Sequence, residues 1–446
     1  MRETEYLEIV TGQIRCKKAR DMVAEELRQH MEDQTAKYME FGMNEEDARQ
    51  KAVEQMGDPV LVGTQMDCIH RPGMDKSTFL FICLMSVFGA FLWHILAGRD
   101  GGGIFDLGAF TKTLVSSCLP GILIMFLVMR MDYTLLGRHP FAAALMVIGF
   151  AWIYNLQSGY PLNGKYGMNY LFLAFVMFFY GAAVYAFREK GYKGIFICLM
   201  WLFVQTVLLF LSSGHFVNLF NFYMNGLLVM SVAAWKGWFG VERKKALPAI
   251  WGSVTVSACF LFLPGLISNG YRWQRMQGWF QTANSQFNYV TSRIQEEVSG
   301  AGLLHGTGNS MPADSHNQNE YFLISLISRH GYLAAFLIMA LLGILFFLLM
   351  KGIKNAKNRL GTLMGCAAVF SLMLPVLEHL LYNIGLLPAG ALVLPFFSAA
   401  GSDAYLQGSY CAGAIFAYYA AMGICLSVYR IRNVVSEKRR VCYENV

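Results

Sequence analysis

The chain has 446 residues, of which 55% are hydrophobic and only 15% are charged, and its net charge is +7. Soluble domains carry roughly 25% charged residues, so this composition excludes an ordinary soluble protein. The charge is also unevenly divided. Residues 1–70 hold 15 acidic and 9 basic side chains, whereas the remaining residues hold 14 acidic and 27 basic ones. This asymmetry indicates one part in water and one part in a membrane.

Residues 1–72 predict a small helical domain. Apolar residues recur at helical spacing from Glu5 to Tyr38, and Asn44 is placed to cap a second helix that Gly57 ends. The segments EELRQHMEDQ and NEEDARQKAVEQMGDP resemble the permease prefix domain that precedes some bacterial membrane proteins. The resemblance implies a bacterial, Firmicute-like origin and a cytoplasmic partner or regulator for this domain.

Apolar runs of about the ~20 residues that cross a bilayer follow from residue 77 onward. Ten spans are predicted, near residues 77–98, 113–130, 140–157, 168–187, 194–213, 217–235, 247–268, 332–350, 360–383 and 409–429. The apolar stretch 385–400 contains Pro388, Gly390 and Pro395, which favours a broken or re-entrant segment over an eleventh span. The fold class is therefore all-α: a ten-helix membrane domain over residues 73–432, preceded by the helical domain and followed by a basic tail, 433–446.

The loops between the spans predict the orientation. Alternate loops are rich in lysine and arginine, among them the loops near Arg188 and Lys244, and the tail is basic as well. The positive-inside rule then predicts a multi-pass protein of the bacterial plasma membrane with both termini in the cytoplasm. These basic residues lie between apolar spans, so they do not indicate nucleic-acid binding. The single long loop, residues 269–331, falls on the outer side.

The long loop holds the residue types that chemistry on a water-soluble group needs. Arg275 is suited to a phosphate, and Trp279 to the membrane surface. The carboxylates Glu296, Glu297 and Glu320 are candidates for a general base. A solvated amphipathic loop without chemistry is the simpler alternative.

The ninth span carries Glu378 and His379 within an apolar run. A charge inside a bilayer costs at least ~2.5 kcal/mol, so such residues usually have a function, unless they lie at the hydrated end of the span. None of the ten cysteines forms a CxxC pair, and no zinc-ligand spacing is present. We therefore expect no metal site and no cofactor, with a divalent cation left open.

Three segments resemble the shape, elongation, division and sporulation (FtsW/RodA/SpoVE) family. HLLYNIGLLPAGALVLPFFSAAGS, residues 379–402, aligns without gaps with the family pattern NIGMVIGLLPVTGIPLPFISYGGS and includes Pro395 and Ser398. GAGLLHGTG, residues 300–308, is similar to the family's GGLFGKG turn, and EYFLISLISRHG, residues 320–331, is similar to DFIFAVIGEELG. Glu320, His379, Pro395 and Ser398 of these segments, together with Arg275 and Trp279 of the long loop and Glu378 of the ninth span, are the candidate substrate-binding residues.

The resemblance implies a glycosyltransferase that polymerises a lipid-linked disaccharide-peptide, lipid II, outside the cell with a transpeptidase partner. The family's catalytic Asp lies ten residues after an arginine, and counting from Arg275 gives Ser285. A serine is no base at neutral pH, so Glu296 or Glu297 becomes the candidate base. Two alternatives remain open: a non-catalytic relative that scaffolds or regulates a wall-synthesis complex, and a transporter of a lipid-linked precursor or one coupled to protons.

Overall fold

The computed structural model describes residues 1–97, 107–157, 169–213, 216–257, 270, 273–274, 277, 289–308, 319–356, 358–387, 393–398 and 407–431. Within these ranges the regular elements are all helices, and no strand occurs. The prediction of an all-α polytopic membrane protein is confirmed by this helix content and by the apolar helices described below.

Four helices form the N-terminal part: α1 (Glu3–Gln13), α2 (Lys17–Glu40), α3 (Glu45–Gln55) and α4 (Pro59–His70). Asn44 caps α3 as predicted, because its side-chain oxygen accepts the N–H of Asp47 at 2.8 Å. The single helix expected from Glu5 to Tyr38 is instead broken at residues 14–16, and the prediction was wrong there. The backbone N–H of Arg15 donates to the Asp67 carboxylate at 2.8 Å, so a contact with α4 holds this break.

The membrane part contains seven described helices that are long and apolar enough to cross a bilayer. They comprise α5 (Lys76–Ala97), the continuous run of α6 (Leu107–Thr113), η1 (Leu114–Cys118) and α7 (Leu119–Arg130), then α9 (Pro140–Gln157), α11 (Gly191–Ser213), α18 (Tyr332–Lys354), α19 (Arg359–Asn383) and α20 (Gln407–Arg430). Two further predicted spans coincide with α10 (Asn169–Ala186) and α12 (Phe216–Trp235). The predicted span 247–268 overlaps α13 (Arg243–Ser257), and its second half lies outside the described residues. The short helix α8 (Tyr133–Leu136) links α7 to α9.

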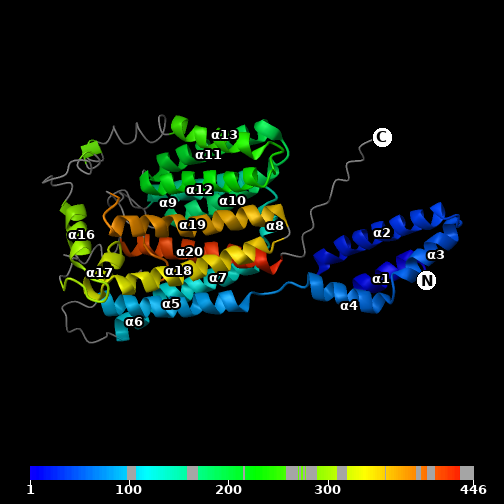
Figure 1. Cartoon of the computed structure of the whole chain (residues 1–446), viewed down its shortest axis with the longest axis horizontal. Helices are drawn as coiled ribbons and strands as arrows, with labels where there is room; N and C mark the ends of the chain where they lie inside the picture. Colours follow the sequence, from blue (N-terminus) through cyan, green and yellow to red (C-terminus); the bar gives the residue numbers. More distant parts are fainter. Residues whose placement is uncertain are drawn as a thin grey trace.

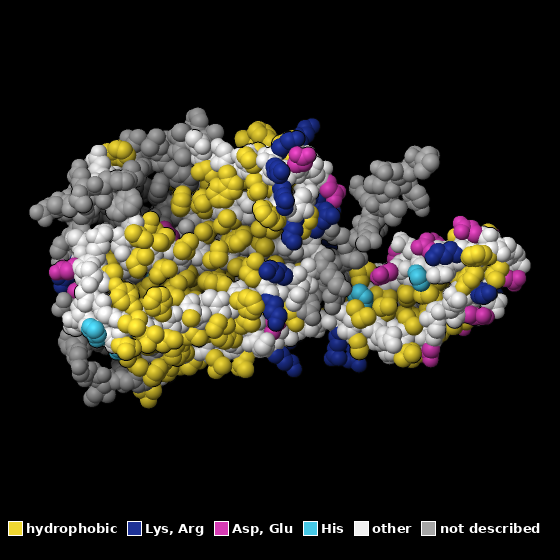
Figure 2. All heavy atoms as spheres, in the orientation of Figure 1, with side chains coloured by type: hydrophobic (Ala, Val, Ile, Leu, Met, Phe, Trp, Pro, Cys, Tyr) yellow, Lys and Arg dark blue, Asp and Glu magenta, His cyan; other side chains and the backbone are white. Residues whose placement is uncertain are grey.

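Two ends of this bundle differ in chemistry. The helices α16 (Tyr289–Gly300) and α17 (Phe322–His330) lie at one end, here called the loop end (Figure 1). Lysine and arginine side chains gather in a band at the opposite end, here called the basic end, which faces α1–α4 (Figure 2). Apolar side chains cover the visible face between the two ends. This pattern is the one that the positive-inside rule predicts for a protein whose basic end is cytoplasmic.

Helix α20 is the central helix of the bundle. In its most apolar stretch, 83% is buried inside the protein, against 28% in the corresponding stretch of α18. It packs against α7, α10 and α19, and small residues allow the close approach: a Cβ at Gly423 would lie 2.7 Å from the carbonyl oxygen of Met125 on α7. Glycine at a tight helix crossing is typical of membrane bundles.

The stretch predicted to be broken rather than spanning is non-helical where the structure describes it. Residues 385–387 and 393–398 form turns and bends beyond the end of α19. Residues 393–398 are buried at the loop end of the bundle. Phe396 has a backbone φ of 72°, which residues other than glycine rarely adopt, so the surrounding packing holds this conformation in place.

Candidate functional site at the loop end

Helix α16 carries the two carboxylates that were predicted as bases, and they lie in opposite environments. Glu297 is only 1% exposed, accepts a hydrogen bond from the Thr307 hydroxyl and lies 3.6 Å from Nη2 of Arg293. The Glu296 side chain is 68% exposed and accepts from Nη1 of the same arginine at 2.8 Å. Glu297 therefore holds the following turn, whereas Glu296 is open to a substrate. Arg293 joins the two.

The turn after α16, residues 301–308, depends on its glycines. The N–H of Gly302 donates to the His305 carbonyl at 2.8 Å, and the N–H of Gly308 donates to the Ser328 carbonyl at 3.2 Å. A Cβ at Gly306 would overlap the carbonyl oxygen of Ser328 at the end of α17. The backbone approach between this turn and α17 therefore requires a residue without a side chain.

Asn383, the last residue of α19, forms hydrogen bonds with three backbone groups and is fully buried. Its Oδ1 accepts the N–H of Ile324 at 3.0 Å, which satisfies a donor in the first turn of α17. Its Nδ2 donates to the carbonyls of Glu320 at 3.0 Å and of His379 at 2.9 Å. One amide side chain thus fixes α17 to the end of α19.

The segment 393–398 packs beneath α17. The rings of Phe397 and Phe322 stack with their centroids 5.3 Å apart. The Tyr418 hydroxyl on α20 donates to the Val393 carbonyl at 2.7 Å. Pro395 and Ser398 are buried in this packing, and the Ser398 hydroxyl donates to the Leu394 carbonyl at 3.3 Å. In this arrangement Pro395 and Ser398 stabilise the segment by internal packing and hydrogen bonding.

The intramembrane pair Glu378 and His379 lies one turn before Asn383. Glu378 accepts a hydrogen bond from Nδ2 of Asn221 on α12 at 2.5 Å and is partly buried. His379 is fully buried. Because an amide donor faces the carboxylate, Glu378 is directed toward the interior of the bundle rather than toward lipid, as intramembrane carboxylates usually are.

Seven of the ten candidate site residues lie at or near the loop end: Glu296, Glu297, Glu320, Glu378, His379, Pro395 and Ser398. Arg275, Trp279 and Ser285 lie outside the described residues. Four residues that sequence reasoning did not select organise the site: Arg293, Thr307, Asn383 and Asn221. Polar side chains within or beside the matched segments were the available signal for Thr307 and Asn383.

The described residues include no group of three or more His, Cys, Asp or Glu side chains placed to hold a metal ion. What the loop end offers chemically is an exposed carboxylate beside a guanidinium. Such a pair can accept a proton from a hydroxyl group at one position and stabilise a phosphate at the other. Buried Glu297, which lies beside Arg293 and accepts a hydrogen bond from Thr307, helps to hold Arg293 and Glu296 in place.

No protein-family profile matches the sequence, and no curated protein matches it. Solved structures do match over 81% of this chain and 98% of theirs, at 15% identity. One is a chain from a peptidoglycan synthase complex, described for its structural coordination of polymerization and crosslinking, with a TM-score of 0.61. Others are the rod shape determining protein RodA of Thermus thermophilus, with a TM-score of 0.52, and a point variant of it, with 0.53. The chain therefore has the RodA fold.

Proposed function

We propose that this chain is a membrane protein of bacterial cell-wall synthesis that acts on a lipid-linked saccharide at the outer face of the plasma membrane. The observation that carries the proposal is the convergence of the matched segments. The turn at 301–308, α17, the end of α19 and residues 393–398 form one packed unit at the loop end of a RodA fold. A fold alone gives only an analogy of function. The proposal therefore depends on the fact that the segments that resemble the family meet at one place in this fold.

The reaction that fits this site is glycosyl transfer. A hydroxyl of the acceptor sugar loses its proton to a carboxylate and attacks the anomeric carbon of the donor, whose bond to the lipid pyrophosphate breaks. Among the described loop carboxylates Glu296, Glu297 and Glu320, Glu296 is the most exposed and so the best placed to take the proton. Arg293 lies beside it and can stabilise the negative charge of the leaving pyrophosphate. Glu297, being buried, acts as a positioning residue through Thr307.

Polymerisation of lipid II by the purified full-length protein tests this proposal, with glycan strands separated on a gel. Glu296→Gln should lower the rate by roughly 10²–10⁴-fold, the usual contribution of a general base. Glu242→Gln is the matched control, because Glu242 is an exposed carboxylate with a cationic neighbour, Lys245 at 3.3 Å, at the basic end. Equal activity of the Glu296→Gln and Glu242→Gln variants would rule out Glu296 as the base.

A non-catalytic scaffold of a wall-synthesis complex is the second candidate. It is favoured by the internal role of Glu297 and by the serine at position 285, where the family pattern has aspartate. If the wild-type protein makes no glycan while Ser285→Asp does, the chain is a degenerate relative that regulates its partners. Co-purification with a transpeptidase would then be the expected property, since one structural neighbour belongs to a peptidoglycan synthase complex.

A further inference from the structure

The turn after α16 exposes two adjacent leucines. Leu303 is 60% exposed and Leu304 is 71% exposed, although the hydrogen bonds described above fix the backbone of the turn. Single exposed leucines are common on protein surfaces, but two neighbours on a fixed turn form an apolar patch. A patch of this kind indicates contact with a partner or with a membrane.

The patch adjoins the lipid-facing side of α18. The N–H of Leu333 donates to the Leu303 carbonyl at 2.9 Å, and the N–H of Tyr332 donates to the Gly302 carbonyl at 3.1 Å. Leu333 is itself exposed, and so are the apolar residues one turn further along α18, Phe336 and Leu337. Because residues three and four apart lie on the same side of a helix, an apolar surface continues from the turn onto the span.

The length of α18 sets the depth of this surface. Its 23 residues extend about 34 Å at roughly 1.5 Å per residue, close to the ~30 Å thickness of the hydrocarbon core. Lys351 and Lys354 stand in the last turn of the helix, at the basic end. The first residues of α18 therefore lie near the opposite boundary of the hydrocarbon, and Leu303 lies beside them. The turn is thus at the depth where acyl chains meet headgroups.

The charged residues beside the patch fit lipid headgroups. Arg329 and His330 are exposed in the last turn of α17. A Cβ at Gly306 would lie 2.8 Å from the backbone nitrogen of Arg329, so the turn contacts this end of α17. Residues 300–308 and 328–333 contain no aspartate or glutamate. An apolar patch with basic neighbours is suited to a phospholipid surface, where acyl chains adjoin phosphates.

We propose that the 301–308 turn is a membrane anchor, in which Leu303 and Leu304 enter the bilayer leaflet at the loop end and Arg329 lies at the level of the lipid phosphates. The partner is the phospholipid surface itself. Thr307 of the same turn donates to Glu297, so the anchor also sets the position of α16 relative to the membrane. The proposal does not depend on the proposed function, because it concerns contact with lipid rather than glycan synthesis.

A fluorescent label measures the depth of the turn. The purified full-length protein with Cys68→Ser is placed in vesicles of phosphatidylethanolamine and phosphatidylglycerol, and Leu303→Cys carries a nitrobenzoxadiazole label. Two matched sites have almost the same exposure in the protein: Leu337, 59% exposed on α18, and Leu61, 58% exposed on α4. We expect the label at Leu303→Cys to emit at short wavelength and to be quenched by spin-labelled acyl chains, as at Leu337→Cys. The labelled Cys68→Ser parent is the blank. Emission and quenching equal to those at Leu61→Cys would overturn the proposal.

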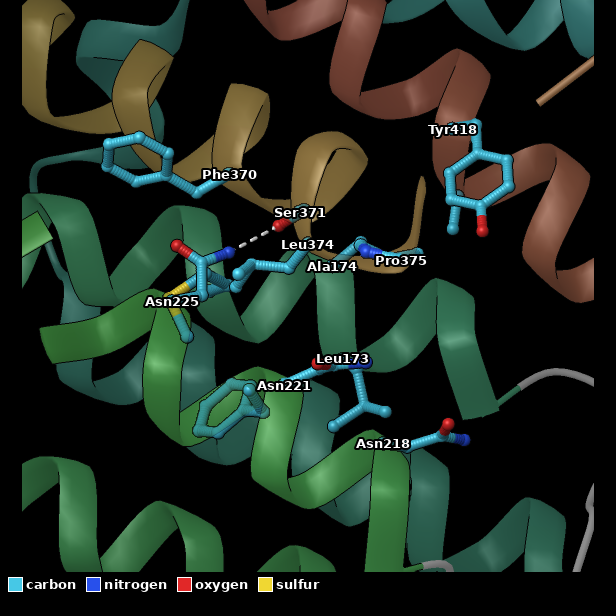
Figure 3. A pocket seen from close by; sticks show the side chains of 13 residues that line it. Leu173, Ala174, Asn218, Asn221, Asn225, Phe370, Ser371, Leu374, Pro375 and Tyr418 are labelled. Atoms are coloured by element: carbon cyan, nitrogen blue, oxygen red, sulfur yellow. Dashed lines mark hydrogen bonds between the residues drawn. The ribbon is translucent and has the colours of Figure 1, made fainter. Parts of the chain in front are cut away.

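Hydrogen exchange tests the anchor without a label. Both leucines are exposed in the protein, so the double variant Leu303→Asn, Leu304→Asn removes few internal contacts. In the same vesicles the backbone amides of residues 301–308 should exchange roughly 10–100-fold faster in this variant, because the burial of about one leucine side chain in lipid is lost. Ser371→Ala is the control for general destabilisation. It removes a hydroxyl that accepts from Nδ2 of Asn225 at 2.7 Å inside the bundle (Figure 3), and it should leave exchange in the turn unchanged. Unchanged exchange in the double variant, or an equal increase in Ser371→Ala, would contradict the anchor.

Discussion

The side chain of Asn383 and the backbone of Ile324, 59 residues apart, are joined by a hydrogen bond of 3.0 Å that fixes the start of α17 to the end of α19. Asn383→Ala removes this bond and two more, and it leaves the buried N–H of Ile324 without a partner. We expect a loss of roughly 2–3 kcal/mol in unfolding free energy, seen as a lower apparent Tm. Asn355→Ala, at an exposed position after α18, should leave the Tm unchanged. Similar Tm values for the two variants would show that the junction does not stabilise the fold.

Gly306 allows the 301–308 turn to lie against α17. In Gly306→Ala the new methyl group meets the Ser328 carbonyl, so the turn must move away from the helix. We expect the Tm to fall. We also expect the backbone amides around Glu297 to exchange their hydrogens faster, because Thr307, its hydrogen-bond partner, moves with the turn. Gly343→Ala on α18 is the control, since nothing lies within 4 Å of its Cβ position. In a helix that change should be neutral or slightly stabilising.

Asp75 caps the first membrane helix. Its carboxylate accepts the N–H of Thr78 at 3.1 Å and the hydroxyls of Ser77 and Thr78 at 2.7 Å. Burial raises the pKa of Asp75, but these hydrogen bonds outweigh it, and the pKa lies below its usual value. The ionised cap therefore stabilises the fold above the unfolded-state pKa of about 3.9, and this contribution is lost as the pH falls through the lower folded-state pKa.

Asp75→Ala should cost about 1 kcal/mol at neutral pH, the usual value for a lost cap. Asp75→Asn should retain most of the stability, because asparagine also caps, and its difference from Asp75→Ala should not depend on pH. The measurement is the Tm of the three proteins between pH 3 and pH 7. A wild-type advantage over Asp75→Ala that grows as the solution becomes acidic would contradict the direction of the pKa shift.

The orientation of the bundle is open to direct labelling in intact cells. Cys68 is exposed on α4, so a membrane-impermeant thiol reagent should modify it only after lysis. In a Cys68→Ser background, Ser299→Cys on the exposed side of α16 should be labelled from outside, and Lys244→Cys at the basic end should not. Labelling of Lys244→Cys in intact cells would place the loop end in the cytoplasm.

Residues 1–70 are expected to fold without the membrane part. Tyr6, Val10 and Ile14 are fully buried, and the Tyr6 hydroxyl donates to the Met56 carbonyl at 3.1 Å between α1 and the end of α3. The isolated segment should show a helical circular dichroism spectrum and a cooperative melt. Tyr6→Phe should lower its stability by roughly 1 kcal/mol through the lost hydrogen bond. A coil spectrum would mean that the helices need the membrane part or a partner in order to order.

Features that depend on neighbouring residues in the chain were predictable. The apolar run of α18 and the Asn44 cap of α3 are local patterns, and both occur where the sequence indicates them. The break at residues 14–16 was missed because it depends on Asp67, 52 residues away. The helix after Gly57 was also missed: Asp58 caps at 2.8 Å a new helix, α4, that Pro59 begins. A proline after one helix fits equally well at the first position of the next.

The site shows the same division. The sequence motifs indicated which segments meet at the loop end, but the different environments of the adjacent residues Glu296 and Glu297 follow from Thr307 in the turn. Likewise the inward direction of Glu378 follows from Asn221, which lies 157 residues earlier. Side-chain partners at such separations are set by packing, which residue spacing does not record.

Helix α20 makes contacts at its C-terminal end and near its middle that link the segment after α4 to residues 393–398. Near the basic end, the Arg430 carbonyl accepts the N–H of Gly73 at 3.2 Å in the linker that follows α4, and Nε of Arg430 donates to the Met129 carbonyl at 3.0 Å. Toward the loop end, Tyr418 holds Val393. A rigid helix transmits displacement along its axis from one such contact to the other. Tension applied to the N-terminal helices by a bound protein would therefore reach residues 393–398 without any change in the helices between them.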